Sequence, residues 1–377
     1  MKSQGCKPKQ VLTLLGPIGF SRSLFLCPKC HRTRFPGDEE LAIVHTSRSP
    51  GVRRLVGHFA AKEPFKEVSN DMAIAAGISL SPKDAERIAE TLGKQMEAWA
   101  NAERTHLRFQ EPPPPDAPKT IPTLYVEYDG TGVPMVRREV AGRKGKQGDG
   151  SAKTREAKIG CVFTQTIQDQ NGRPIRDPSS TSYVGAIEDC HTFGARIFGE
   201  AVRRGLYDAV RVVALGDGAA WIQNLAATQF GQAQFIVDLY HAREHLTTLC
   251  HALFGQGTLP AQRYRDTWSG LLDEGAIEAI LEQAQAFLPQ DPKGKPDARR
   301  ELAYFEKNKA YMRYGKFRAQ GLFVGSGVVE AACKNVAGKR LKQSGMEWSV
   351  AGANAILSLR CTVLSGRAED FWETRAA

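Results

Sequence analysis

The chain has 377 residues, and its 51 Lys and Arg outnumber its 41 Asp and Glu, which gives a formal net charge of +10. This length predicts two or three units around a sizeable core, and the charge favours a polyanionic partner. No long apolar run, basic amphipathic helix or signal peptide is recognised, which argues against a membrane protein and makes nucleic acid the expected partner. The eight cysteines are scattered, so a disulfide framework is not expected and a reducing cytoplasm fits.

The first segment, residues 1–50, reads as two short strands followed by a Cys-x-x-Cys knuckle at Cys27 and Cys30. Two thiolates at this spacing are half of a zinc ribbon, because they can grip one tetrahedral Zn²⁺ ion. The other half is missing, and His31 or His45 would have to complete four ligands. The alternative is a pair of reduced thiols in a shortened ribbon.

Residues 51–110 follow a helical period that Gly77 interrupts. Ser81, followed by proline, is typical of a helix N-cap. Two helices around Gly77 predict a helix-turn-helix that could place the helix of residues 81–93 in a DNA major groove. A helical hairpin that only packs against its neighbours is the alternative. The proline-rich segment 111–120 predicts a stiff linker and a domain boundary.

Residues 123–128 alternate as a strand, which ends at Asp129 where Gly130 and Gly132 break the pattern. A carboxylate at the mouth of a strand can be held rigidly with its oxygens free for a hard divalent cation. Taken alone, the same residues also fit an Asp-Gly turn that closes a hairpin.

A glycine-rich basic segment follows, and its cations lack helical spacing. It predicts a mobile loop that contacts the phosphate backbone, with a solvated hairpin tip as the alternative. The expected contacts are Arg137, Arg143, Lys144, Lys146 and Lys153.

Further strands are predicted at residues 158–167, near 183–187 and at 210–215, the last being a continuous apolar run that ends before Asp217. Another strand ends at Asp238, and a long helical stretch follows. Glu330 then lies on a helix after a Gly-Ser-Gly start. The order of elements predicts an α/β fold with antiparallel strands first and parallel strands later.

Five motifs in this order resemble bacterial insertion-sequence transposases of the DDE type, with the ISKra-type family, related to mutator-like elements, as the nearest branch. The resemblance extends over residues 50–367. It rests on DGTGVPM at 129–135, GRKGK at 142–146, GDGAAWI at 216–222, DLYHAREHL at 238–246 and GSGVVEAACK at 325–334.

The resemblance implies a ribonuclease H-like core, a mixed sheet flanked by helices, with a helical insertion and an N-terminal region that recognises terminal inverted repeats. In that core the first and fourth strands are neighbours. The implied parts are a partial zinc-ribbon-like hairpin at 1–50, a helix-turn-helix-like region at 51–110, a linker at 111–120, core at 121–244, insertion at 245–320 and core again at 321–377.

The implied catalytic triad is Asp129, Asp217 and Glu330, which would bind two Mg²⁺ or Mn²⁺ ions. Asp238 and His241 match an Asp-x-x-His motif of mutator-like relatives, although a helix-start Asp that caps its own amides explains the pair equally well. Trp348 matches a tryptophan found beyond the glutamate. Phosphate contacts around the scissile strand are also expected from the cluster Lys334, Lys339, Arg340 and Lys342, unless it is only a solvated helix face.

The predicted function is therefore a transposase that cuts DNA at the element ends and joins the 3′ ends to target DNA by metal-dependent phosphoryl transfer. Double-stranded DNA and further copies of the chain are the expected partners, in the cytoplasm at the nucleoid, with no membrane and no small-molecule substrate. The alternatives are a metal-dependent nuclease with the same core but no strand transfer, and a domesticated or truncated DNA-binding derivative.

Overall fold

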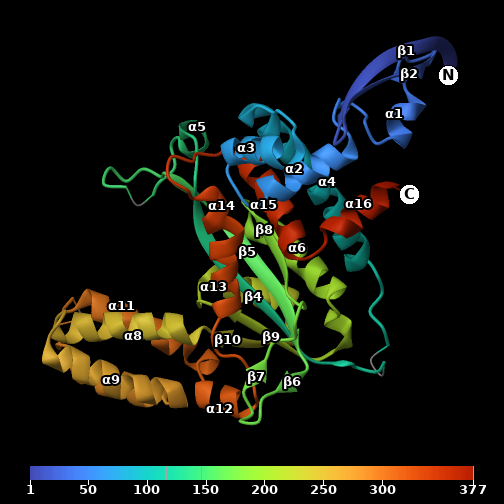
Figure 1. The fold of residues 1–377 in the computed structure, drawn as a ribbon. Coiled ribbons are helices and arrows are strands. Elements are labelled where there is room, and N and C mark those ends of the chain that lie inside the picture. The colour runs from blue at the N-terminus through green and yellow to red at the C-terminus, as the bar shows by residue number, and fades with distance from the viewer. Residues whose placement is uncertain (115–116, 146, 292, 377) are drawn as a thin grey trace.

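The computed structural model describes residues 1–114, 117–145, 147–291 and 293–376 (Figure 1). Part of the predicted linker and the predicted DNA contact Lys146 lie outside these residues. None of the described helices is both long and apolar enough to cross a membrane.

A five-stranded mixed sheet forms the centre of the molecule, in the order β10-β9-β4-β5-β8. Strand β5 pairs antiparallel with both β4 and β8, whereas β4, β9 and β10 run parallel to one another. The mixed α/β fold predicted from the sequence is thus confirmed, and so is the placement of the first and fourth long strands side by side. The strands are β4 (Ile121–Pro134), β5 (Thr154–Gln165), β8 (Ser182–Ala186), β9 (Ala209–Gly216) and β10 (Gln234–Val237).

Helices cover both faces of the sheet. On one face, α6 (Cys190–Arg203) and α7 (Ala220–Gln229) bury side chains such as Ile197 and Leu225 against Val126. The other face carries α13 (Gly327–Ala332), the π-helical turn η3 (Cys333–Gly338), α14 (Lys339–Leu341) and α15 (Val350–Leu364). Because β4 is covered on both sides, its residues 123–128 are all buried.

Helices α2 (Pro50–Ala60) and α4 (Pro82–Arg108) pack on α15, and α3 (Phe65–Ala76) packs on α2 and α4 within the same hydrophobic core. The N-cap predicted at Ser81 is confirmed, since its hydroxyl accepts a hydrogen bond from the Asp84 N–H at 3.1 Å. The helix runs on to Arg108 rather than ending at Gly93, however. Its apolar stripe, including Leu92, is buried inside the molecule. That stripe is therefore a packing face rather than a face that reads DNA.

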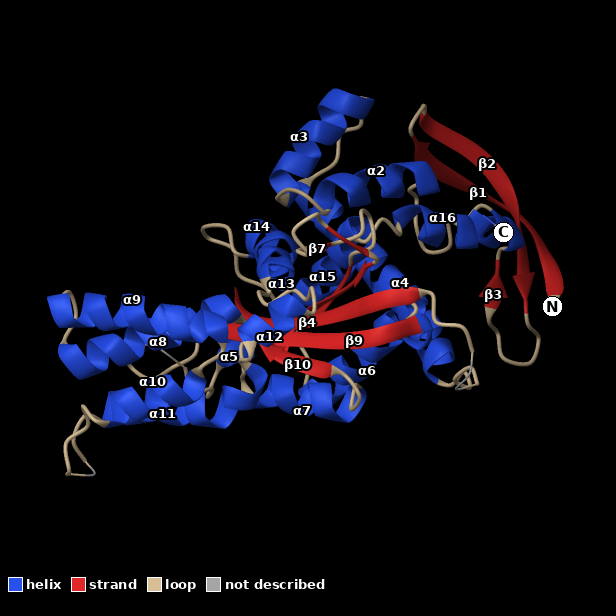
Figure 2. Cartoon of the chain, turned by 90° about the horizontal axis from the view of Figure 1, so that it is seen from below, coloured by secondary structure: helices blue, strands red, loops and turns tan. Residues whose placement is uncertain are grey.

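Helices α8 (Leu239–Phe254), α9 (Leu259–Glu274), α10 (Ile277–Gln285) and α11 (Pro296–Asn308) form an arm at the edge of the sheet, seen at the left of Figure 2. The N-terminal hairpin β1 (Lys2–Thr13) and β2 (Gly16–Leu26) extends from the opposite end with β3 (Thr33–Arg34) and α1 (Pro36–Glu40). The shorter elements are α5 (Arg137–Val140), β6 (Ile167–Gln168), β7 (Pro174–Ile175), η1 (Leu206–Asp208), η2 (Lys309–Tyr311), α12 (Tyr314–Ala319) and α16 (Ala368–Ala376).

Gly93 lies where α4 approaches α15 closely. A Cβ atom at this position would lie 2.0 Å from the backbone oxygen of Ala355, which cannot swing aside as a side chain can. We expect Gly93→Ala to destabilise the fold by about 3 kcal/mol, because two packed helices must separate. Thermal unfolding checks this, with a fall in the unfolding midpoint as the expected result.

Gly270 on α9 is the matched control, because a Cβ there meets nothing within 4 Å. Gly270→Ala should raise the free energy of unfolding by roughly 0.5–1 kcal/mol through helix propensity alone. Equal unfolding midpoints for the two variants would contradict the packing described for α4 and α15.

Candidate functional site

Asp129 and Asp217 stand at neighbouring positions of the central sheet. Asp129 lies within β4, and Asp217 directly follows β9. The parallel register pairs Glu127 with Leu215, and two further residues along each strand bring Asp129 beside Asp217. The two Asp-Gly sequences therefore meet at one place, and neither forms the tip of a two-residue hairpin.

The pKa of Asp129 reflects its burial and the groups that surround it. Burial has the largest effect and raises the pKa of its carboxyl, and the charge of Asp217 raises it further. Hydrogen bonds from the Cys333 thiol and the Gly130 N–H lower the pKa, as does His241. The Asp129 carboxylate is thus largely shielded from solvent, with a second carboxylate and a histidine close by.

Cys333 is a member of this site that the sequence did not single out. Burial, followed by the charge of Asp129, raises the pKa of its thiol, which therefore remains neutral at pH 7 and donates a hydrogen bond to that carboxylate. Its position three residues after Glu330 would have placed both side chains on one face of a helix. That spacing is the signal that could have pointed to it.

Glu330 lies exposed on α13, and its charge acts on Cys333. Across the described ranges of the chain, no three His, Cys, Asp or Glu side chains are arranged so that they could hold a metal ion together. The structure thus brings Asp129 and Asp217 together as a pair, with Glu330 one helical turn from the thiol that contacts Asp129.

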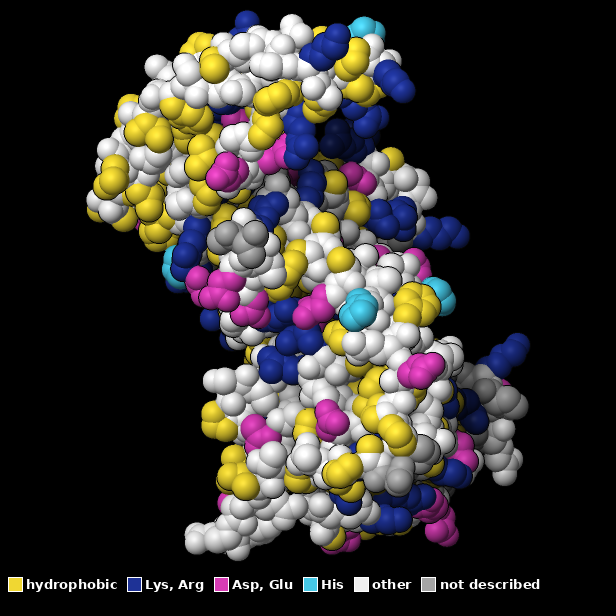
Figure 3. Space-filling view, turned by 90° about the vertical axis from the view of Figure 1, so that its right-hand side faces the viewer, with side chains coloured by type: hydrophobic (Ala, Val, Ile, Leu, Met, Phe, Trp, Pro, Cys, Tyr) yellow, Lys and Arg dark blue, Asp and Glu magenta, His cyan; other side chains and the backbone are white. Residues whose placement is uncertain are grey.

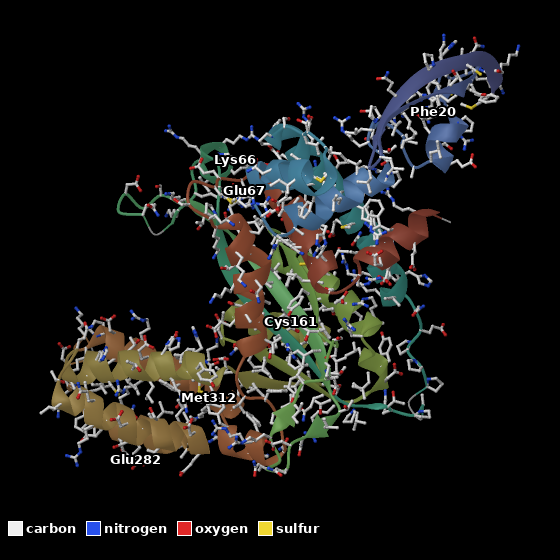
Figure 4. All side chains as sticks on the ribbon, in the orientation of Figure 1. Phe20, Lys66, Glu67, Cys161, Glu282 and Met312 are labelled. Atoms are coloured by element: carbon white, nitrogen blue, oxygen red, sulfur yellow. The ribbon has the colours of Figure 1, made fainter. Side chains whose placement is uncertain are left out.

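Glu127 ties α13 to the sheet. It is fully buried on β4, where its Oε2 accepts hydrogen bonds from the Val329 N–H at 2.8 Å and from the Cys161 thiol at 3.7 Å. Figure 4 shows Cys161 among the strands of the central sheet. Burial raises the pKa of Glu127 to about 8, so the carboxyl is mainly protonated at pH 7. This contact fixes the residue that precedes Glu330.

Asp238 has the structural role that was the alternative to catalysis. Its Oδ1 caps α8 by accepting the His241 N–H at 2.7 Å, and its Oδ2 accepts the N–H of Ser326. Both carboxylate oxygens are thus occupied by backbone donors, and the second bond holds the turn that leads into α13.

The helical arm supports the Asp217 side of the site. The hydroxyl of Tyr304 on α11 donates to the backbone oxygen of Asp217 at 3.1 Å, while Asp217 Oδ1 accepts the Ala219 N–H at 2.8 Å. His245 stacks on Tyr304 with ring centres 3.7 Å apart. His241, one turn earlier on α8, is more exposed and lies near Asp129. The arm therefore fixes the backbone at Asp217.

Most of the predicted phosphate contacts are exposed. The four described members of the basic segment lie around α5 and the loop after it, where a backbone bridge between Lys144 and Ser151 makes a hairpin-like tip. Lys342 donates to the Thr131 hydroxyl, which places its ammonium group beside β4 just beyond Asp129. The exposed cations are Arg137, Arg143, Lys144, Lys153, Lys334, Lys339 and Lys342.

Arg340 is a correction to the sequence analysis. Its side chain is fully buried, donates from Nε to the backbone oxygen of Ala60 at 2.9 Å and lies over the rings of Phe65 and Trp348. It therefore has no surface with which to contact DNA. Trp348 is likewise a packing residue, whose Nε1 donates to the backbone oxygen of Leu341 at 3.0 Å.

The knuckle at Cys27 and Cys30 lies outside the main site. All eight cysteines of the chain are free thiols. The Cys30 and Lys29 backbone N–H groups donate to Cys27 and lower the pKa of its thiol. Neither His31 nor His45 joins the pair in a group that could hold a metal ion, so zinc binding stays a prediction.

Figure 3 shows Lys and Arg side chains beside this hairpin module at the top of the face, whereas charges of both signs are mixed below it.

Comparisons with known proteins give one family match and a distant structural likeness. No curated protein matches the chain. The structure of the Drosophila P element transposase strand transfer complex is similar with a TM-score of 0.27 and 11% identity, over 90% of this chain and 85% of that chain. The model of an uncharacterised protein family, UPF0236, matches residues 203–375, a part of the chain that contains Asp217 and Glu330 but not Asp129.

Proposed function

We propose that the chain is a DNA transposase of the DDE type, which cleaves DNA at the inverted repeats of an insertion sequence and joins the 3′ ends to target DNA. The observation that carries the proposal is the pairing of Asp129 and Asp217 on adjacent parallel strands. The strand order supports a ribonuclease H-like core, since the first strand lies at the centre between an antiparallel neighbour and a parallel one. The formal charge of +10 and the exposed basic segment support DNA as the substrate.

The donor set of the pair fits Mg²⁺ or Mn²⁺. Such hard cations prefer carboxylate oxygens, and Mg²⁺ is commonly held by one or two carboxylates together with waters and substrate phosphates. Asp129 and Asp217 match that pattern. Burial, with a smaller contribution from the charge of Asp217, raises the pKa of the Asp129 carboxyl, and a bound cation would favour its ionised form. Glu330 is proposed as the third ligand, contributed from α13.

Two divalent ions bound there would supply activation of water or a 3′-hydroxyl and stabilisation of the leaving oxygen. The chain's own residues hold the geometry. Cys333 orients the Asp129 carboxylate through its thiol, and Tyr304 fixes the backbone of Asp217. His241 stands where it can orient the scissile phosphate or move a proton at its partly exposed imidazole. Lys342 can neutralise a phosphate beside β4.

The active complex is proposed to contain at least two copies of the chain, because two element ends must be handled together. The protein would act at the nucleoid, where its DNA substrate lies. Neither a membrane nor a small-molecule substrate enters this proposal.

Incubation with a labelled inverted-repeat end, a target plasmid and Mg²⁺ tests the proposal. Joined products are the expected result. Cut ends without joining would instead support a ribonuclease H-like nuclease that lacks strand transfer. Retarded DNA without any cutting would support a domesticated or truncated derivative that only binds DNA, and would contradict the enzymatic role.

A further inference from the structure

A cavity of about 760 Å³ opens between the β6–β7 hairpin, the start of α8 and the segment that leads into α13. Three arginines line it, and among the described residues its lining includes no Asp or Glu. Its floor is apolar. We call it the arginine–tyrosine pocket, after Arg173, Arg243, Arg318 and Tyr240.

Tyr240 presents an unusually free aromatic ring to this pocket. The residue is 59% exposed, and in the described part of the chain its ring packs on no other aromatic ring. The ring lies against Gly325, where an added Cβ would come within 2.7 Å of it. A glycine at this point thus leaves the space that the ring occupies, while more than half of the Tyr240 residue stays exposed.

Two of the arginines are held in place by one carboxylate. Arg243 donates to both oxygens of Asp273 at 2.7 Å, and Arg318 lies 3.6 Å from the same carboxylate. The guanidinium carbon of Arg243 is also 5.7 Å from the centre of the Tyr240 ring. Arg173, exposed on the hairpin, adds a third charge. Since Asp273 offsets only one of three cations, the pocket keeps a positive charge.

An open aromatic face beside fixed guanidinium groups is the arrangement that binds single-stranded nucleic acid, with a base stacked on the ring and phosphates on the cations. The volume lies within the range of about 300–1,000 Å³ typical of small-ligand pockets, which suits one nucleotide and not a duplex. The wall of the pocket includes Gly327 and Val328, which shortly precede Glu330, and Tyr240 directly precedes His241.

We propose that the arginine–tyrosine pocket receives one unpaired nucleotide of the DNA strand next to the scissile phosphate, with its base on Tyr240 and its phosphates on Arg173, Arg243 and Arg318. The proposal rests on the proposed function, which places the scissile phosphate at Asp129 and Asp217. The unpaired nucleotide belongs either to the strand that is transferred or to the flanking strand that is left behind.

Binding of labelled DNA in EDTA tests this site without any catalysis. The probes are a single-stranded oligonucleotide, a blunt duplex, and duplexes with an unpaired overhang on one strand or the other. Tyr240→Ala should weaken binding of the single strand about tenfold, whereas Tyr240→Phe keeps a stacking face and should bind as the wild type does. Phe109→Ala is the matched control, because that ring is 80% exposed at the end of α4. Blunt-duplex binding should not change in any variant.

Crosslinking gives the position directly. An overhang that carries 5-iodouracil should crosslink to Tyr240 on irradiation, and the overhang polarity that reacts identifies the flanking or the transferred strand. Unchanged single-strand binding by Tyr240→Ala, or an equal loss on the blunt duplex, would overturn the proposal. A crosslink at Tyr240 in a protein that never cuts DNA would uphold the pocket while the proposed function fails.

Discussion

Asp217→Asn is expected to abolish DNA cleavage while DNA binding stays intact. The substitution keeps the size of the side chain and the acceptor for the Ala219 N–H, so the turn after β9 should survive. It removes one of the two carboxylates that would hold the divalent ions. A metal ion contributes several kcal/mol to stabilising the transition state, which corresponds to a loss of about 10³-fold or more in cleavage rate. This loss is measured by comparing the rates at which the wild type and Asp217→Asn cleave a labelled DNA end in Mg²⁺.

Asp208→Asn is the matched control for this experiment. Asp208 is exposed and precedes β9, so it stands at the end of the strand opposite to Asp217. Its loss should leave the cleavage rate unchanged. If Asp217→Asn still cut the DNA end at the wild-type rate, Asp217 would have no place in the catalytic site.

Glu127→Gln is expected to change how stability depends on pH. The unfolded carboxyl has an ordinary pKa of 4.5, and burial raises the pKa to about 8 in the folded protein. Between these values the folded state binds more protons, so the contribution of Glu127 to the free energy of unfolding falls as the pH rises through this window. The total fall is up to about 5 kcal/mol.

The glutamine variant cannot ionise, but it still offers an oxygen to the Val329 N–H. Unfolding in EDTA at pH 5 to 9 should therefore show the wild type losing stability relative to Glu127→Gln toward alkaline pH. Glu156→Gln is the control, because that carboxylate is about half exposed on the neighbouring strand β5. A constant difference between wild type and Glu127→Gln at every pH would show that Glu127 is already ionised in the folded protein.

The strands of the sheet could be predicted from the sequence because the apolar patterns that mark them are local. Alternating and continuous apolar runs define β4 and β9. The predicted end of the first strand at Asp129 is wrong, however, because its antiparallel pairing with β5 carries β4 on to Pro134. The expectation that Asp129 and Asp217 lie side by side came from the resemblance, which implies a core in which the first and fourth strands are neighbours, and the parallel pairing of β4 with β9 agrees with it. Whether these residues form a working catalytic site is a separate prediction that the fold alone does not test.

Other features depend on contacts between distant segments. The cluster of cations after Glu330 looks uniform in sequence, yet the π-helical turn at Cys333–Gly338 shifts the helical period and turns Arg340 inward. Glu127 occupies the polar phase of an alternating strand, but α13 covers that face and buries it. The apolar stripe of α4 likewise could not reveal that α15 is the surface it packs on.

The central claim is that Asp129 and Asp217 together form a divalent-cation site. Titration with Mn²⁺, with the free ion followed by electron paramagnetic resonance, tests this claim without DNA. We predict that the wild type and Asp208→Asn bind Mn²⁺, and that Asp129→Asn and Asp217→Asn each lose that binding. Mn²⁺ binding that is the same in all four proteins would contradict the account.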